Sequence, residues 1–311
     1  MNDLVPRKLG GSLIERAAQV YDFNAELRAR NPQPPVAEPA PPPLRVVAPA
    51  EDAPLVLDAP AVVAPSGAVA VVDRAMLAAN GLLVPGAPVG ALAEEFRLVK
   101  RHLMVTARTL RRTDATRART ILVCSAKPND GKTYCALNLA ISMAAEREVE
   151  VILIDADFAK PDVMNRLGLT EGTGLLDALA DPSIDIEGCI VRTDVPQLSV
   201  LPAGTKSHND TELLGSAGTA AIISALLAAD PRRVLIFDSP PVLAASPAAA
   251  LAHHAGQTVL VVRADRTVEG DLREAVALLS GCDEIQLLLN AVSYAPGGRR
   301  FGSYYGQEDL K

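Results

Sequence analysis

Residues 120–133, TILVCSAKPNDGKT, decide how this chain folds. The first residues are apolar and predict a short buried strand, and the apolar spacing over 134–145 predicts a helix directly after the stretch. Between strand and helix, AKPNDGKT fits the phosphate-loop pattern of four variable residues followed by Gly-Lys-Thr, with Ala126 in place of the first glycine. Strand, loop and helix in this order are the context that the motif requires, so the sequence predicts a nucleotide-binding loop.

The chemistry of such a loop follows from its backbone and three side chains. Successive backbone N–H groups and the positive helix N-terminus attract phosphate oxygens. Gly131 lets the backbone approach closely, Lys132 places a charge on the β- and γ-phosphates, and Thr133 offers its hydroxyl to Mg²⁺. We expect ATP and Mg²⁺ as cofactors. The candidate cofactor-binding residues here are Lys127, Pro128, Asn129, Asp130, Gly131, Lys132, Thr133 and Tyr134.

From residue 120 onward, strands and helices are predicted to alternate. The strand segments are continuous apolar runs, which is typical of a parallel sheet covered on both faces. The fold class is therefore α/β, a doubly wound and mostly parallel sheet with its ligand at the carboxyl ends of the strands. Strands are expected at 120–125, 149–154, 197–201, 233–237, 257–263 and 285–289, and helices at 132–145, 161–167, 210–229, 246–254 and 268–280.

Carboxylates follow two of the predicted strands. The strand at 149–154 ends in Asp155-Ala156-Asp157, and the strand at 233–237 ends in Asp238. In a phosphate-loop domain, an Asp at a strand end can hold Mg²⁺ or its waters, and a second one can orient or deprotonate a nucleophile. A single Asp after a strand is most often a turn or helix-capping residue. Both features together with the loop favour a catalytic site.

Outside this core the sequence predicts two further segments. Residues 12–30 have a capping-box spacing at their start and an apolar stripe, so we expect an amphipathic helix that docks on the main domain or on a partner. Residues 31–68 are rich in Pro and Ala, which predicts an extended linker, either a spacer or a docking site for a proline-binding module. The expected parts are 1–31, 32–68 and a nucleotide-binding domain over 69–311, with a Gly-rich flexible tail over about 292–311.

Composition narrows the class of protein. A hydrophobic share of 49% over 311 residues supports a large core, which Ala, Leu and Val must fill because aromatics make up only 3%. The net charge of −7 argues against a nucleic-acid partner. No apolar run reaches the roughly 18–20 residues of a membrane span, and the start lacks the apolar region of a secretory signal. The four cysteines have no ligand spacing, which predicts buried thiols in a reducing cytoplasm.

A long helix is predicted over about 89–110. Its apolar residues fall on one face, while Glu94, Arg97 and Arg101 fall on another at spacings of three and four, which allows ion pairs along a solvated face. Arginines continue beyond the helix up to Arg119. This basic character favours an acidic membrane surface, a neighbouring subunit or nucleic acid as the contact.

Together these motifs resemble the cytoplasmic tyrosine autokinases of bacterial polysaccharide export, which belong to the same wider class as the Min-type and Par-type ATPases. SAKPNDGKT, ILIDADFAKP and VLIFDSPP match the three nucleotide motifs of the family, and the resemblance covers 69–311. EEFRLVKRHL is similar to the Glu-x-x-Arg-x-x-Arg oligomerisation motif. The opening SLIERAAQ and the DADFAKP stretch are most similar to exosortase-associated members. The implied oligomer-interface residues are Glu94, Arg97, Lys100 and Arg101.

The resemblance implies a protein-tyrosine kinase that uses ATP and Mg²⁺. Asp155 would receive the tyrosine proton. Arg263 would take the place of an arginine that the family carries after a core strand, and Asn290 would lie near the adenine. The implied catalytic residues are Lys132, Asp155, Asp157 and Asp238, and the implied metal ligands are Thr133, Asp155, Asp157 and Asp238.

The resemblance also implies acceptors and partners. The family's acceptors are tyrosines near the C-terminus, which here are Tyr294, Tyr304 and Tyr305. Phosphorylation would occur in trans within a ring or dimer, and phosphates on the tail would add negative charge that weakens association. The implied partner is an inner-membrane chain-length or co-polymerase protein of polysaccharide assembly. The implied location is the cytoplasm, peripheral at the inner membrane.

Four positions depart from the family pattern or point elsewhere. Ala159 stands where many members have an arginine, for which Lys160 substitutes poorly in bidentate contacts, and Asn129 stands where glycine is usual. Lys127 occupies the position of the signature lysine of Min-type and Par-type ATPases. An ATPase switch that dimerises on ATP without kinase activity is therefore the alternative, and a nucleotide-sensing scaffold is a third hypothesis.

Overall fold

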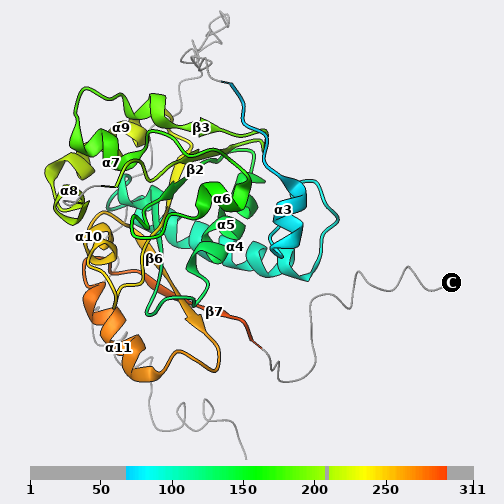
Figure 1. Ribbon diagram of the computed structural model, residues 1–311. Helices are drawn as coiled ribbons and strands as arrows, with labels where there is room; N and C mark the ends of the chain where they lie inside the picture. Colours follow the sequence, from blue (N-terminus) through cyan, green and yellow to red (C-terminus); the bar gives the residue numbers. More distant parts are fainter. Residues whose placement is uncertain (1–67, 207–209, 293–311) are drawn as a thin grey trace, which may run out of the picture. The chain divides into compact units, whose positions relative to one another are not determined.

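The computed structural model describes residues 68–206 and 210–292 (Figure 1). The chain divides into two units, Met1–Val63 and Ala64–Lys311, and all described residues belong to the second. The predicted N-terminal helix, the linker up to residue 67 and the tail from residue 293 lie outside the described residues. So do the three tail tyrosines.

Within the described residues the core is one sheet of seven strands in the order β3-β4-β2-β5-β1-β6-β7. All neighbouring strands are parallel except the short β3, which pairs antiparallel with β4. This confirms the doubly wound, mostly parallel fold class. The strands are β1 (Thr120–Ser125), β2 (Glu150–Asp155), β3 (Val191–Arg192), β4 (Leu198–Leu201), β5 (Arg233–Asp238), β6 (Gln257–Arg263) and β7 (Ile285–Asn290).

Helices cover both faces of the sheet, and each face has its own buried apolar cluster. One face carries α3 (Arg74–Ala79), α4 (Ala91–Leu110), α5 (Lys132–Ala144) and α6 (Val163–Leu167). The other carries α7 (Leu175–Ala180), α8 (Asp210–Leu214), α9 (Ala217–Ala229), α10 (Pro247–Ala252) and α11 (Glu269–Leu278). Two 3₁₀ turns, η1 (Arg117–Arg119) and η2 (Ile186–Cys189), complete the domain. None of the described helices is both long and apolar enough to span a bilayer.

The predicted helix at 210–229 is wrong in one respect, because the structure divides it into α8 and α9. The break follows from local capping: the Ser216 side chain accepts a hydrogen bond from the N–H of Gly218 and begins a new helix. Sequence reasoning also missed α7 and β3, which are only six and two residues long. The predicted buried thiols are confirmed, since all four cysteines are free and buried.

The chain enters the sheet at the β3 edge. Ala70 forms a single parallel bridge with Thr193, just after β3, and the Val72 N–H donates to Oδ1 of Asp194 at 2.9 Å. The guanidinium of Arg74 holds the same carboxylate at 2.7 Å. These contacts seat α3 against α6.

A second tether joins the segment 81–90, which we call the strap, to the helix that follows the phosphate loop. The Leu83 N–H donates to Oδ1 of Asn138 at 2.7 Å, and the hydroxyl of Tyr134 donates to the Gly81 carbonyl at 2.9 Å. Asn138 is fully buried and uses its amide nitrogen to donate to the Tyr134 carbonyl. The strap is therefore held to α5 by a buried amide side chain and by a tyrosine hydroxyl.

Replacing Asn138 by leucine, of similar volume, should leave the Leu83 N–H buried without an acceptor. We expect the free energy of unfolding to fall by about 1–3 kcal/mol, the usual cost of an unsatisfied buried donor. Urea denaturation of the full chain measures this. Asn80→Leu is the matched control, because Asn80 is exposed and its amide bonds only to Met76. An equal loss in both variants would contradict the assigned role of Asn138.

Candidate active site

The phosphate loop follows β1 and ends at Gly131, the residue before the first turn of α5. Gly131 has a φ of 99°, in the left-handed region that favours glycine. A Cβ at this position would lie 2.1 Å from Nδ2 of Asn290. That amide nitrogen donates to the carbonyl of Asp130 at 2.9 Å. The backbone conformation therefore favours glycine at this position, and a larger residue would also displace the Asn290 amide from the loop.

Arg263, the last residue of β6, contacts the backbone of the phosphate loop. Nη1 of Arg263 donates to the Asn129 carbonyl at 2.8 Å, which places this side chain on the loop backbone. Asn129 itself has a φ of 67°. Asparagine tolerates this left-handed conformation better than other non-glycine residues, which explains how it replaces the family's usual glycine.

Two residues that sequence reasoning missed complete this support. The hydroxyl of Thr267 donates to Oδ2 of Asp130 at 3.4 Å, and Oδ2 of Asp271 lies 2.5 Å from Nζ of Lys127. Thr267 belongs to the connection from β6 to α11 and Asp271 to the first turn of α11, and both are separated from the loop by more than a hundred residues. No local motif marks them, so only the tertiary structure could find them.

The two carboxylates at the carboxyl ends of β2 and β5 are direct neighbours. Asp155 and Asp238 are register partners on adjacent parallel strands, which lie about 4.8 Å apart. Both side chains are almost fully buried. Burial first, and then the Asp238 charge, raise the pKa of Asp155 to about 7.

The oxygens of Asp155 are already engaged. Oδ2 accepts from the backbone N–H groups of Asp162 and Val163, both at 3.0 Å, and Oδ1 accepts from the Asp157 N–H at 3.2 Å. Asp155 therefore fixes the loop after β2 and the beginning of α6. These N–H groups oppose the rise in its pKa, because they stabilise the charged carboxylate.

Asp238 differs, because in the described part of the chain neither of its oxygens makes a well-formed hydrogen bond, and the Thr133 hydroxyl is only close enough to lower its pKa. Burial raises its pKa to about 6, against the opposing charge of Lys132. The charge of the Arg166 guanidinium on α6 also lowers this pKa. The sequence alone did not single out this arginine. Two buried carboxylate oxygens of this kind beside a phosphate loop are suited to bind a cation.

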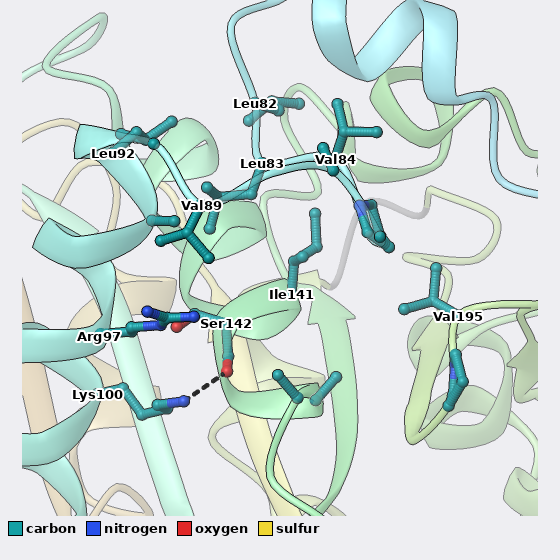
Figure 2. Close-up of a pocket in the computed structure, with 18 of the residues that line it drawn as sticks. Leu82, Leu83, Val84, Val89, Leu92, Arg97, Lys100, Ile141, Ser142 and Val195 are labelled. Atoms are coloured by element: carbon teal, nitrogen blue, oxygen red, sulfur yellow. Dashed lines mark hydrogen bonds between the residues drawn. The ribbon is translucent and has the colours of Figure 1, made fainter. Parts of the chain in front are cut away.

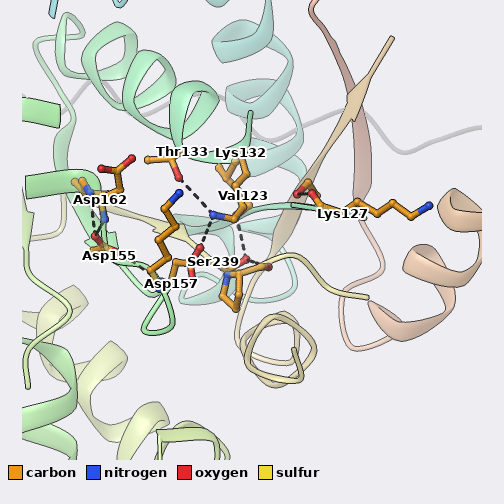
Figure 3. A network of polar contacts seen from close by, with 12 residues as sticks. Val123, Lys127, Lys132, Thr133, Asp155, Asp157, Asp162 and Ser239 are labelled. Atoms are coloured by element: carbon orange, nitrogen blue, oxygen red, sulfur yellow. Dashed lines mark hydrogen bonds and ion pairs between the residues drawn. The ribbon is translucent and has the colours of Figure 1, made fainter. Parts of the chain in front are cut away.

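Lys132 reaches across to the second carboxylate of the β2 motif. Its ammonium lies 2.5 Å from Oδ2 of Asp157 and 3.5 Å from the Thr133 hydroxyl (Figure 3). Burial alone would lower the pKa of Lys132, but the charges of Asp238 and Asp157 outweigh it, and the pKa is raised. The ammonium thus stays charged between carboxylates.

These residues fit a magnesium–nucleotide complex. Among the described residues, no group of three or more His, Cys, Asp or Glu side chains is arranged to hold a metal by itself. Mg²⁺ seldom needs one, because it keeps several waters and takes one or two carboxylates together with substrate phosphates. The bare oxygens of Asp238, the Thr133 hydroxyl and the glycine-dependent loop supply that kind of site.

The structure brings together Lys132, Thr133, Asp155, Asp157 and Asp238, as Figure 3 shows for the first four. Lys127 extends away from this cluster toward Asp271. The Tyr134 side chain is turned toward the strap. The roles predicted for these side chains, for Pro128 and for the nucleotide contacts of Arg263 and Asn290 stay predictions.

The predicted interface helix is α4. Arg97 pairs with Glu94 one turn before it, and Arg101 is exposed. Lys100 instead points inward and is only 8% exposed. Its ammonium contacts the Ser142 carbonyl at 3.0 Å and Oε1 of Glu146 at 2.6 Å. Among the predicted interface residues, Lys100 is therefore buried and makes its contacts within its own chain.

Comparison with known proteins agrees with this fold and site. A family described as an AAA domain matches residues 118–284. Tyrosine-protein kinase YwqD of Bacillus subtilis is 31% identical over 196 residues, which cover 61% of this chain and 79% of YwqD. The solved tyrosine kinase domain of BceF is 26% identical with a TM-score of 0.53, covering 63% of this chain and 76% of that domain. The chain belongs to the bacterial tyrosine-protein kinases that carry this phosphate-loop AAA domain.

The match to a longer relative is confined to one part of it. The putative tyrosine-protein kinase EpsB of Ralstonia solanacearum is 31% identical over 189 residues, which cover 60% of this chain but only 25% of EpsB. The shared region is therefore the phosphate-loop domain. What the remainder of EpsB does is not carried over to this chain.

Replacing Asp238 by asparagine should stabilise the chain without nucleotide at pH 8, by roughly 1–3 kcal/mol. The folded chain keeps protons on Asp238 and Asp155 where the unfolded chain has lost them, so stability falls as pH rises from about 4 to about 7. Asp238→Asn should flatten this fall.

Urea denaturation at pH 5 and pH 8 tests the sign of this effect. Asp157→Asn is the matched control, because it removes the partner of Lys132 and should instead lower stability at pH 8. If Asp238→Asn destabilised the chain at pH 8 as much as Asp157→Asn does, the proposed origin of the pH dependence would be refuted.

Proposed function

We propose that this protein is an ATP-dependent protein-tyrosine autokinase that phosphorylates its C-terminal tyrosines in trans and regulates exopolysaccharide assembly. One observation carries the proposal: the convergence of the phosphate-loop Lys132 with Asp155, Asp157 and Asp238 at the carboxyl ends of adjacent strands. Kinase relatives that are 31% identical to this chain over the aligned 189–196 residues support the same reaction class.

Each carboxylate has a distinct task in this proposal. Asp155, whose pKa is raised to about 7, is poised near neutral pH to accept the proton of a tyrosine hydroxyl, as an efficient general base should be. Asp238 would hold Mg²⁺ through its bare oxygens, with Thr133 and bound waters. Asp157 would hold Lys132 in position until phosphate oxygens compete for the ammonium. When bound, Mg-ATP supplies the phosphoryl group and neutralises its developing charge.

The acceptors in this proposal are Tyr294, Tyr304 and Tyr305. The tail that carries them follows β7, whose last residue, Asn290, contacts the phosphate loop of the same chain. Transfer to a second chain requires association, for which the exposed side of α4 around Arg97 and Arg101 is the proposed surface. Lys100 is assigned no part in it, since it is buried.

We propose further that the chain acts in the cytoplasm, peripheral at the inner membrane through a chain-length or co-polymerase protein. Such a partner would activate the kinase, and each phosphate placed on the tail would add roughly −1.5 to −2 charge that weakens association. A homo-oligomer, ring or dimer, is the proposed active form.

Incubation with Mg-ATP should add phosphate to Tyr294, Tyr304 or Tyr305, and Lys132→Met should abolish it by removing the charge that holds the phosphates. Peptide mass spectrometry measures this. To test transfer in trans, Lys132→Met is mixed with a chain whose three tail tyrosines are phenylalanine. Phosphate should then appear on the Lys132→Met chain. Phosphorylation of Lys132→Met when it is alone would show that the site is misplaced.

The alternative is an ATPase switch that dimerises on ATP without kinase activity. Lys127 motivates it, because it stands at the signature position of that class and its side chain remains 47% exposed. In this chain, however, the ammonium is held by Asp271 of the same molecule at 2.5 Å. A partner site would have to displace that ion pair. ATP binding without turnover would instead favour the nucleotide-sensing scaffold.

Lys127→Ala separates the two enzymatic hypotheses. If the protein is an autokinase, this variant should retain phosphotyrosine formation within about tenfold of wild type, because the Lys127 ammonium pairs with Asp271 and points away from the carboxylate cluster. If it is a switch, ATP-dependent dimers should vanish in sedimentation, and wild type should consume ATP with no phosphotyrosine. Asp271→Ala is the matched control, since it frees Lys127 without removing it.

A further inference from the structure

A pocket of about 650 Å³ lies between the strap, α4, the C-terminal half of α5 and the turn at 195–197 (Figure 2). It is distant from the carboxylates, because the pocket meets α5 at Ile141–Ala145 whereas the phosphate loop ends where α5 begins. Its volume falls within the range of about 300–1,000 Å³ that is usual for small-molecule sites. The function proposed above uses only one of its lining residues, Arg97, which belongs to the proposed association surface.

The walls of this pocket are mostly apolar. Aliphatic side chains come from all four elements, so the lining is continuous and does not belong to a single helix face. Two strap residues, Pro85 and Pro88, have no backbone N–H to donate, which lowers the polarity of that wall further. The labelled aliphatic side chains are Leu82, Leu83, Val84, Val89, Leu92, Ile141 and Val195.

The charged residues that line the pocket are all basic. They are Arg97, Lys100 and Arg147, and among the described residues no carboxylate lines it. Arg97 and Arg147 are exposed at its rim, whereas Lys100 is buried and 8% exposed. An apolar pocket with cations gathered along one side has the polarity of a site for an anion with an apolar body.

Lys100 gives this site a built anion contact. An ammonium has three N–H donors, and two of them meet the Ser142 carbonyl and the Glu146 carboxylate. In the described part of the chain no third acceptor is found for it. Glu146 already pairs with this charge, but a buried N–H without an acceptor is unfavourable, so the anionic head of a ligand in the pocket would complete the hydrogen bonding of the ammonium.

We propose that this pocket binds a small amphipathic acid, with its anionic head at Lys100 and its apolar body against the strap and Ile141. A purely inorganic anion would leave the aliphatic walls in water, and a neutral apolar ligand would leave the Lys100 donor unused. Only a ligand with both parts satisfies both sides of the pocket. The site is independent of the proposed kinase reaction.

Octanoate, octanol and acetate separate the contribution of the anionic head from that of the apolar body. Each is monomeric and soluble at millimolar concentration. Binding to the full chain is measured by isothermal titration calorimetry, and hydrogen exchange of the strap locates it. We expect octanoate to bind at least tenfold more tightly than octanol or acetate. Equal binding of octanol and octanoate, or of acetate and octanoate, would overturn the proposal.

Variants then place the ligand in the pocket. Lys100→Met keeps the length of the side chain but removes its charge. Val89→Asp places a negative charge on the strap wall, which repels the octanoate carboxylate. Each should weaken octanoate binding about tenfold, in line with the loss of one charge-assisted contact. Arg108→Glu, an exposed change on the same helix outside the pocket, should alter it less than twofold. Lys132→Met should also leave it unchanged, which excludes binding at the phosphate loop.

Thermal unfolding without ligand checks that each variant is folded. If Lys100→Met and Val89→Asp are folded and both bind octanoate as wild type does, the pocket is not the site. If Arg108→Glu weakens binding as much as they do, the effect is general electrostatics and the proposal fails.

Discussion

The constraint on which the site depends is the pairing of β2 with β5, which places two buried carboxylates side by side. Asp155 and Asp238 are direct register partners at the carboxyl ends of these strands. Neither position is exposed, so their mutual repulsion is weakly screened and must be offset by nearby groups. Backbone N–H groups at the beginning of α6 offset the charge of Asp155. The Lys132 ammonium offsets that of Asp238.

The surrounding elements can be understood as supports for this arrangement. The end of β6, the following connection and the start of α11 hold the phosphate loop through Arg263, Thr267 and Asp271. The strap and α3 hold α5 and α6 from the other side. Among the described residues, Asp238 is the carboxylate at this site with both oxygens buried and without a hydrogen bond, which favours binding of a cation there. Stability is therefore given up at the point where the chemistry is expected, as is common at functional sites.

Much of this could be predicted from sequence. The buried strands were predicted to within one residue at each end, because continuous apolar runs bounded by turns leave little ambiguity. The phosphate loop and the carboxylates follow from local motifs. The division at Ser216 was missed because a capping hydroxyl within an apolar segment is a weak signal. The six-residue α7 is too short to show a helical period.

The parts of the site that could not be predicted all depend on tertiary contacts. Nothing in DADFAKP indicates that Asp155 spends its oxygens on backbone N–H groups, while Asp238 keeps both of its own bare. Thr267 and Asp271 reach the loop only because β6 lies beside β1. The resemblance to the oligomerisation motif placed Lys100 at an interface with Glu94 and Arg97, yet Lys100 turns inward, because its ammonium finds acceptors at the end of α5.

The way in which the chain enters the domain has a consequence for aggregation through the edges of the sheet. An open sheet offers its outermost strand as a template on which foreign strands can add, and proteins usually obstruct that strand. Here the bridge from Ala70 to Thr193 and the Arg74–Asp194 ion pair lay the incoming chain along the β3 side. The segment before α3 thus covers the β3 edge of the sheet. Growth of a misfolded aggregate would have to begin from the opposite border, at β7, where Leu287 and Leu289 are more than half exposed.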